Sequence, residues 1–291
     1  MSDPAREQTP TQSMLSAAIR PGSLNWFTCL YAAPAPRIRL RALFAFRHAC
    51  EMVVQRVQEP DIARIKLAWW REEIGRYANG NAVHPLCKTL LDEHGEPLLD
   101  PATMARVVDA AQMDLAKTRY PQSDDLLRYC RLGGGSLLSL QAEILHGKAF
   151  AVDHQDALLN IGSWIRLIEL LRDLRVNLAV GQLYLPLQWL DESGLTIADF
   201  DSDRPQPAAV AITRLLGQLT RAQIAEHTDS VAASKLGAHP SAAASLAMHR
   251  RMFDKMHGSD YQDVFLGKTA LSAFEMMRVS WRAARRAARQ D

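Results

Sequence analysis

The amino-acid sequence predicts an all-α protein built as a single bundle of helices. Three observations support this prediction: apolar residues recur at helical spacing along most of the chain, strand-like alternation is absent, and no linker separates two regions of different composition. With 291 residues, 48% of them hydrophobic and 23% charged, the chain can bury a large core. We expect residues 1–20 to form a disordered tail and residues 21–291 to form the helical domain.

Prolines, glycines and capping residues set the expected limits of the helices. Pro34 can stop one helix and Pro36 can start the next, and the turn at residues 79–81 can end another. The helices expected in order are about 24–32, 36–57, 61–77, 85–94, 101–119, 126–146, 153–180, 207–236, 240–257 and 268–289, with a loop over 185–206.

Two of these helices make specific packing predictions. In the third, Ile62, Ile65 and Trp69 have the spacing of a core-facing stripe, so the charged residues between them are expected to face outward. In the sixth, the run Gly133–Gly135 lies inside the helix, and each glycine there costs about 1 kcal/mol relative to alanine. Close approach of another helix or of a ligand would explain the run, and packing is the favoured reason.

Composition excludes several functional classes. A net charge of +2 is too close to zero to indicate nucleic-acid binding. No apolar run approaches the ~20 residues that span a bilayer. The N-terminal segment lacks the apolar region of a secretory signal, and its acidic residues argue against a mitochondrial presequence. Four widely spaced cysteines predict reduced thiols in a cytoplasmic protein.

Three stretches of sequence carry the functional signal. The first combines Ala42–Gln55 (ALFAFRHACEMVVQ) with Lys66–Glu73 (KLAWWREE). The second is Tyr129–Ser136 (YCRLGGGS), and the third is Leu171–Pro186 (LRDLRVNLAVGQLYLP). In this order and spacing they resemble motifs of the squalene/phytoene synthase family. The resemblance is clearest from about residue 25 to residue 190 and fainter toward residue 285.

This resemblance implies a helical bundle around a deep central cavity. In active members of the family, two facing helices each carry a pair of aspartates at positions i and i+4, on one helix face. These carboxylates hold Mg²⁺, which binds the diphosphates of two isoprenoid substrates. The metal is needed because ionisation of an allylic diphosphate leaves a developing negative charge that must be neutralised.

The resemblance fails at these metal-binding positions. The first pair aligns on Glu51 and Gln55, and the second pair aligns on Asp173 and Asn177. His48 replaces an arginine of the family motif. Neutral amides do not supply the charge that holds a metal cluster, so we expect no cofactor, or at most one weakly bound ion at the two remaining acids. Mg²⁺ is expected only if the chain is an enzyme.

The resemblance also assigns further residues to the cavity or ligand-binding wall, beside the four aligned positions. These are Phe44, Phe46, Gly135, Gln141, Arg172 and Tyr184.

The aligned residues have a structural interpretation as well. Glu51 and Asp173 have arginine neighbours in Arg47 and Arg172, and buried charges need partners. The two amides are expected to form interhelical hydrogen bonds. His48 is either a partly buried structural histidine or a catalytic base. The sequence leaves these alternatives open.

The C-terminal segment is basic. Arg282, Arg285, Arg286 and Arg289 fall on one side of the last predicted helix. They indicate either a solvated helix end or peripheral contact with anionic lipid, such as that of an inner membrane. Alanines between the arginines give a weak apolar face, so such contact should be salt-sensitive.

Loss of the paired acids also resembles a branch of the family that includes a mitochondrial factor for assembly of respiratory complex I. The segments Met277–Arg282 and Glu143–Gly147 fit this branch. We therefore predict a non-catalytic protein that acts in binding or assembly, with a protein partner or with an isoprenoid or other lipid in its cavity.

Two alternatives remain. One is a prenyltransferase that uses farnesyl or geranylgeranyl diphosphate with atypical metal dependence; its candidate catalytic residues are Glu51, Asp173, His48 and Tyr184. The other is a lipid carrier whose cavity holds a prenyl chain without chemistry.

Overall fold

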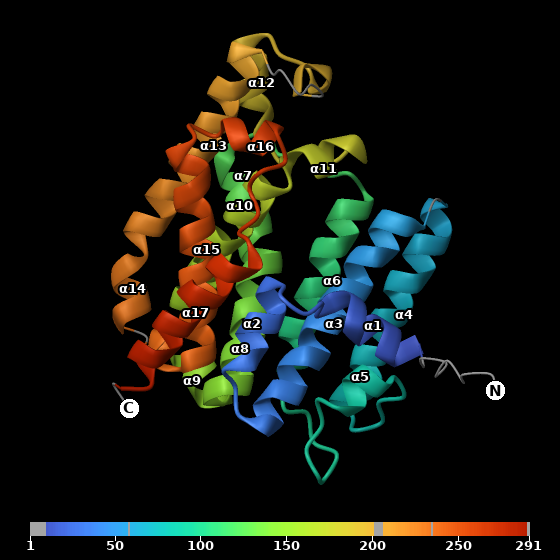
Figure 1. Ribbon diagram of the computed structural model, residues 1–291. Helices are drawn as coiled ribbons and strands as arrows, with labels where there is room; N and C mark the ends of the chain where they lie inside the picture. The colour runs from blue at the N-terminus through green and yellow to red at the C-terminus, as the bar shows by residue number, and fades with distance from the viewer. Residues whose placement is uncertain (1–9, 58, 201–205, 234, 290–291) are drawn as a thin grey trace, which may run out of the picture.

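The computed structural model describes residues 10–57, 59–200, 206–233 and 235–289. These residues form helices joined by loops, which confirms the all-α fold (Figure 1). The helices are α1 (Pro10–Ala18), α2 (Leu24–Leu30), α3 (Pro34–Arg56), α4 (Pro60–Ala78), α5 (Pro85–Lys88), α6 (Pro101–Leu115), α7 (Ser123–Cys130), the π-helix η1 (Arg131–Gly135), α8 (Ser136–His146), α9 (Lys148–Asp153), α10 (Gln155–Arg172), α11 (Leu174–Ala179), α12 (Leu187–Ser193), η2 (Ile197–Phe200), α13 (Pro207–Glu226), α14 (Thr228–Ala233), η3 (Leu236–Ala238), α15 (Pro240–Gly258), α16 (Gln262–Phe265) and α17 (Ala273–Ala287).

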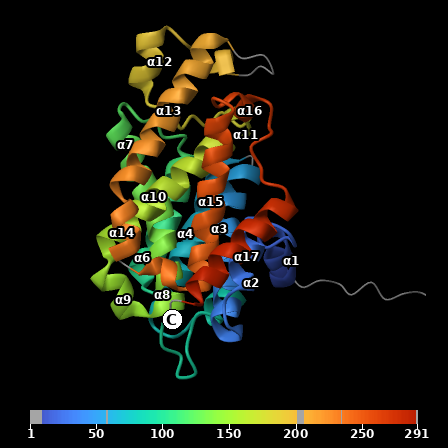
Figure 2. The same cartoon turned by 60° about the vertical axis from the view of Figure 1, so that its left-hand side comes forward.

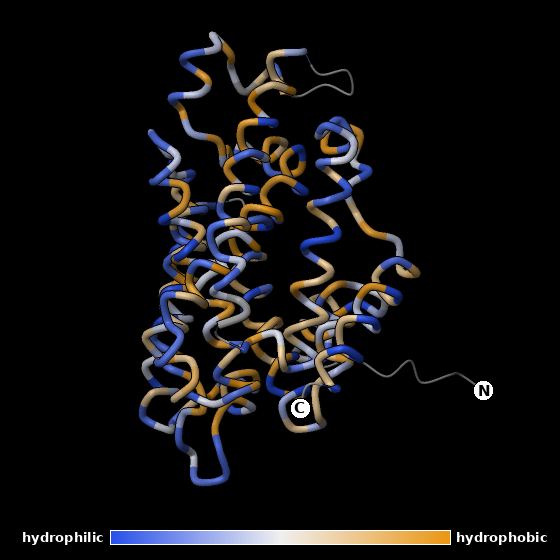
Figure 3. Tube along the Cα trace, turned by 90° about the vertical axis from the view of Figure 1, so that its left-hand side faces the viewer, coloured by the Kyte–Doolittle hydropathy of each residue, from blue (hydrophilic) through white to orange (hydrophobic). Residues whose placement is uncertain are grey.

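The helices pack in two groups. α3, α4 and α6 contact one another on one side, α10 contacts α13 and α15 on the other, and α8 contacts both groups (Figures 1 and 2). Each group has its own apolar core. Hydrophobic residues recur along the helices between hydrophilic ones (Figure 3), so each helix can turn an apolar face toward a core. A cavity lies between the two groups.

Local sequence explains where individual helices begin. Asp100 precedes α6, and its carboxylate accepts hydrogen bonds from the backbone N–H groups of Ala102 and Thr103 at 3.3 and 2.8 Å. Pro101 occupies the first helical position, where its missing N–H is not needed. Such a cap is worth about 1 kcal/mol. The helix then buries Met104 and Val108 in the core.

The glycine run is explained by helix packing, as expected. η1 crosses α10 at Gly162, where a Cβ would lie only 2.3 Å from the carbonyl oxygen of Gly134. A Cβ on Gly134 would lie 2.4 Å from the carbonyl oxygen of Gly162. Only glycine on both helices permits this backbone contact.

The expected N-terminal tail is too long. Residues 1–9 lie outside the described residues, but Pro10–Ala18 form α1, which packs against α3. Ala18 and Ile19 are buried in the same core as α3. Burial of these apolar residues stabilises a helix that the polar N-terminal composition did not indicate.

The core face predicted for α4 is also wrong. Ile65 is 68% exposed, and Ile62 and Trp69 are exposed as well. The helix instead buries a second stripe at helical spacing, which consists of Ala63, Leu67, Trp70, Ile74 and Tyr77. This stripe is the longer of the two, and it ends in a tyrosine whose hydroxyl donates to the carbonyl of Leu90 at 3.0 Å.

Other differences concern helix length. The helix expected over 153–180 is divided into α10 and α11, because the backbone of Asp173 leaves the helical region (φ −99°, ψ 13°). Aspartate favours such breaks since its side chain competes for local hydrogen bonds. The loop expected over 185–206 contains α12 and η2. In the described part of the chain, no helix is long and apolar enough to cross a membrane.

Candidate functional site

A cavity of about 600 Å³ lies between α3 and α10, and the segment from Ala17 to Asn25 borders it. α3 contributes Arg47, His48, Glu51 and Gln55 from successive turns. Arg47, Glu51 and Gln55 are four positions apart, and His48 is three positions before Glu51. All four side chains therefore lie on one side of the helix.

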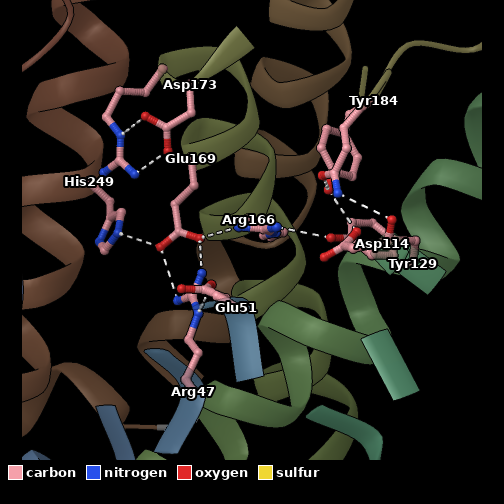
Figure 4. A network of polar contacts seen from close by, with 11 residues as sticks. Arg47, Glu51, Asp114, Tyr129, Arg166, Glu169, Asp173, Tyr184 and His249 are labelled. Carbon is pink, nitrogen blue, oxygen red and sulfur yellow. Dashed lines mark hydrogen bonds and ion pairs between the residues drawn. The ribbon is translucent and has the colours of Figure 1, made fainter. Parts of the chain in front are cut away.

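The acid on α3 is paired within its own helix. Arg47 Nε donates to Glu51 Oε1 at 2.8 Å, one turn away. The same guanidinium reaches across the cavity to α10, where its second terminal nitrogen lies 2.6 Å from Glu169 Oε2 (Figure 4). Arg47 therefore joins the two facing helices.

Glu169 is the centre of this network. Besides Arg47, it forms an ion pair with Arg166, which lies one turn earlier on α10. A terminal nitrogen of Arg166 lies 3.1 Å from Glu169 Oε2. His249 of α15 lies 3.9 Å away, which is too far for a hydrogen bond (Figure 4). Burial alone would raise the pKa of Glu169, but the charges of Arg47 and Arg166 hold this pKa well below its ordinary value.

A second cluster continues from Arg166 to α6. Arg166 donates to the Tyr129 hydroxyl at 2.9 Å, and the Tyr184 hydroxyl donates to Asp114 Oδ1 at 2.7 Å. The two tyrosine rings stack with centroids 5.4 Å apart. Burial raises the pKa of the Asp114 carboxyl. The network thus crosses the cavity from α3 to α6 through side chains of α10.

Asp173 is paired with its sequence neighbour. Arg172 Nε donates to Asp173 Oδ1 at 2.7 Å, and a terminal nitrogen lies 2.5 Å from Oδ2. Asn177, one turn further, lines the same cavity. His48 lies on the opposite wall, and burial lowers the pKa of its imidazole.

In the described part of the chain, a small space adjoins the network. It measures about 30 Å³ and is lined by Cys50, Val107, Gly133 and residues of the network itself. A space of this size holds a water molecule or two. The larger cavity therefore ends at the Arg47–Glu169–Arg166 layer.

Eight of the eleven predicted site residues line the large cavity. They are Phe44, His48, Glu51, Gln55, Arg172, Asp173, Asn177 and Tyr184.

The other three predicted site residues do not line the cavity. Phe46 is fully buried and packs against Trp70. It lies two residues after Phe44, so its side chain points to a different face of α3. Gly135 packs against the backbone of Leu159 on α10. Gln141 is half-buried on α8, away from the cavity wall.

Sequence reasoning missed Asp114, Arg166, Glu169 and His249. A signal for two of them was present: Arg166, Glu169 and Asp173 are spaced by three and four residues, so they share a helix face with the motif. Asp114 and His249 carry no such signal, because they reach the site through tertiary packing. Among the described residues, no group of three or more His, Cys, Asp or Glu side chains is arranged to hold a metal ion.

Comparison with known proteins gives a family match. The family model for squalene/phytoene synthase matches residues 23–285. Phytoene synthase 2 of Solanum lycopersicum is 25% identical over 232 residues, covering 77% of this chain and 75% of that protein. Phytoene synthase 1 of Arabidopsis thaliana is 23% identical, covering 77% of this chain but only 55% of that protein.

The fold resembles solved structures over nearly its full length. A dehydrosqualene synthase crystal structure superposes with a TM-score of 0.80 at 14% identity and covers 96% of each chain. The squalene synthase HpnC from Alicyclobacillus acidocaldarius gives 0.69 at 16% identity, covering 86% of this chain and 95% of that one.

Proposed function

Because the chain belongs to the squalene/phytoene synthase family yet engages its cavity carboxylates with its own side chains, we propose that it acts in binding or assembly without prenyl transfer. The observation that carries this proposal is the pairing itself. Arg47 holds both Glu51 and Glu169, Arg172 holds Asp173, and Tyr184 donates to the remaining acid, Asp114.

The charge balance of the cavity supports the same conclusion. Its lining contains four carboxylates and four guanidinium groups, from Glu51, Asp114, Glu169, Asp173, Arg20, Arg47, Arg166 and Arg172. Their formal charges cancel. A cluster of Mg²⁺ ions requires several anionic oxygen ligands. Each acid could become such a ligand only by giving up its present partner, which is an arginine for Glu51, Glu169 and Asp173 and the Tyr184 hydroxyl for Asp114. The residues present therefore do not fit a magnesium cluster.

The shape of the cavity adds a second line of support. A prenyl chain needs an apolar tunnel, but the space behind the charged network is about 30 Å³. The floor of the main cavity consists of Arg47, Glu169 and Arg166. An apolar chain placed there would remove these groups from water without offering them a partner, which is unfavourable.

Within this proposal we favour a role in assembly of a respiratory complex. The motivation is the resemblance of Met277–Arg282 and Glu143–Gly147 to the branch that includes an assembly factor, together with the paired acids. The partner would then be a protein, and the cavity would be a remnant of the ancestral fold.

A transferase with atypical metal dependence is the second candidate. Glu51 and Asp173 both line the cavity from separate helices, and the curated relatives bear the names of phytoene synthases. In this case His48 and Tyr184 would contact the substrate beside the two acids.

A diphosphate-release assay separates the two candidates. Purified protein is incubated with farnesyl or geranylgeranyl diphosphate and Mg²⁺, with a dehydrosqualene synthase as positive control. We expect release no faster than that of the Glu51→Ala/Asp173→Ala variant. Turnover that this double substitution abolishes would contradict the proposal.

A complementation experiment tests the proposed role directly. In cells lacking the gene, the Glu51→Ala/Asp173→Ala variant is expected to restore the wild-type phenotype, because binding or assembly does not need the two carboxylates. The variant must be expressed at the wild-type level. Failure of a well-expressed variant would favour the transferase.

A further inference from the structure

α17 exposes a stripe of large apolar side chains. Phe274 is 68% exposed, Met277 is 47% exposed and Trp281 is 49% exposed. Their spacing of three and four residues aligns them along one face of the helix. This corrects the weak apolar face expected from the sequence, because the apolar surface comes from these three residues rather than from the alanines between the arginines.

A basic stripe lies beside the apolar one. Arg278, Arg282, Arg285 and Arg289 follow one another at intervals of four, three and four residues, and all four are exposed. Arg285 also lies 5.1 Å above the Trp281 ring, which joins the two stripes. Within residues 10–57, 59–200, 206–233 and 235–289, none of these arginines forms an ion pair with a carboxylate. Most arginines of the cavity network, in contrast, are paired.

The face of α17 opposite the basic stripe is used by the fold. Ser280, Ala284 and Ala287 are buried, α17 packs along α15 (Figure 2), and the Tyr31 hydroxyl lies 3.0 Å from Ser280 Oγ. A capping box between Ser272 and Glu275 fixes the start of the helix. The stripe is therefore presented on a rigid helix that does not need to unfold or rotate to make contact.

α17 begins next to the cavity. A Cβ on Gly22, which lines the cavity, would lie 3.7 Å from the Cβ of Ala273 at the helix start. Just before the helix, the hydroxyl of Thr269 donates to the carbonyl of Arg172 at 3.3 Å. Whatever surface α17 contacts therefore lies close to the cavity rim.

We propose that α17 docks the protein on an anionic phospholipid bilayer. The helix would lie in the plane of the interface, with Phe274, Met277 and Trp281 in the acyl boundary and the arginines at the phosphates. An amphipathic helix with aromatic residues on one face and arginines on its flank has the chemistry of such a contact. Unpaired arginines favour anionic lipid, because they lose no intramolecular partner on binding.

Co-flotation of the full-length protein with vesicles tests this proposal. The vesicles contain phosphatidylcholine alone or phosphatidylcholine with phosphatidylglycerol. We expect binding only to the anionic vesicles and weaker binding as salt is raised. Each neutralised arginine should weaken binding about fivefold, so Arg282→Gln/Arg289→Gln should lose about 25-fold. The control Arg64→Gln/Arg128→Gln removes two exposed arginines elsewhere and should bind as the wild type.

A matched pair of variants tests the apolar stripe. Phe274→Ser should reduce vesicle binding severalfold, while Ile65→Ser on α4, at the same 68% exposure, should not. Equal binding to both kinds of vesicle, or equal losses in test and control variants, would overturn the proposal. A dimer in analytical ultracentrifugation that Phe274→Ser dissociates would also overturn it, because the stripe would then contact a second copy.

Discussion

Replacement of Glu169 by glutamine tests the network that closes the cavity. Glu169 lies 2.6 Å from Arg47 and 3.1 Å from Arg166, and its side chain is 11% exposed. Removal of one partner of a buried pair costs about 3–5 kcal/mol. Arg47 keeps Glu51 as a partner and Arg166 keeps the Tyr129 hydroxyl, so we expect the lower end, about 3 kcal/mol. For 291 residues this lowers Tm by about 5 °C.

The loss should depend on pH in a defined direction. Because the pKa of Glu169 is held well below its ordinary value, its contribution to stability is complete above the unfolded pKa of about 4.5. That contribution is lost as the pH falls through the folded pKa. The wild type and Glu169→Gln should therefore differ most near pH 7 and converge in acid.

Urea denaturation followed by circular dichroism measures both effects. Asp61→Asn is the control, because it removes the acid of an exposed ion pair with Arg64 and should change stability by less than about 1 kcal/mol. If Glu169→Gln is as stable as the wild type at pH 7, the network does not hold the two helix groups together.

Three further substitutions probe other parts of the fold. Gly162→Ala should lower the free energy of unfolding by about 3 kcal/mol or more, because its Cβ would lie 2.3 Å from a backbone atom of η1. Gly75→Ala, with no atom within 4 Å, should instead raise it by up to about 1 kcal/mol. Equal effects of the two variants in urea denaturation would contradict this. Glu143→Gln should stabilise by up to about 2 kcal/mol at pH 7.5, because burial raises the pKa of Glu143 to about 6 and its charged form is disfavoured in the folded state. That gain should vanish near pH 4.5, where the wild-type carboxyl is protonated when folded, and a gain independent of pH would show another cause.

Much of the fold could be predicted because its determinants are local. Pro34, Pro60 and Pro101 begin α3, α4 and α6 close to the expected residues. The Gly133–Gly135 run was expected to mark a close helix contact, and it does. The expected pairings of Glu51 with Arg47 and of Asp173 with Arg172 are both present, since each pair is close in sequence.

The sequence predictions were wrong where the local sequence allowed two arrangements and tertiary packing determined which one formed. α4 carries two apolar stripes, and sequence alone does not show which one contacts α6. Glu169 and Asp114 belong to the site because they contact residues far away in the sequence. Arg47 and Glu169 are 122 residues apart, and Tyr184 and Asp114 are 70 residues apart. Phe46 and Gly135 share motifs with cavity residues but point to other faces of their helices. A family motif therefore locates a site more reliably than it assigns each residue in it.

Titration of the protein with Mg²⁺ measures whether the cavity acids can bind a metal ion. Isothermal titration calorimetry is performed with a non-hydrolysable farnesyl diphosphate analogue present, and a Gln55→Asp/Asn177→Asp variant restores the paired acids for comparison. After subtraction of the heat measured for Mg²⁺ and the analogue without protein, we expect no saturable heat for the wild type, because its cavity acids are held by its own arginines and a tyrosine. Saturable Mg²⁺ binding by the wild type that Glu51→Gln or Asp173→Asn abolishes would contradict it.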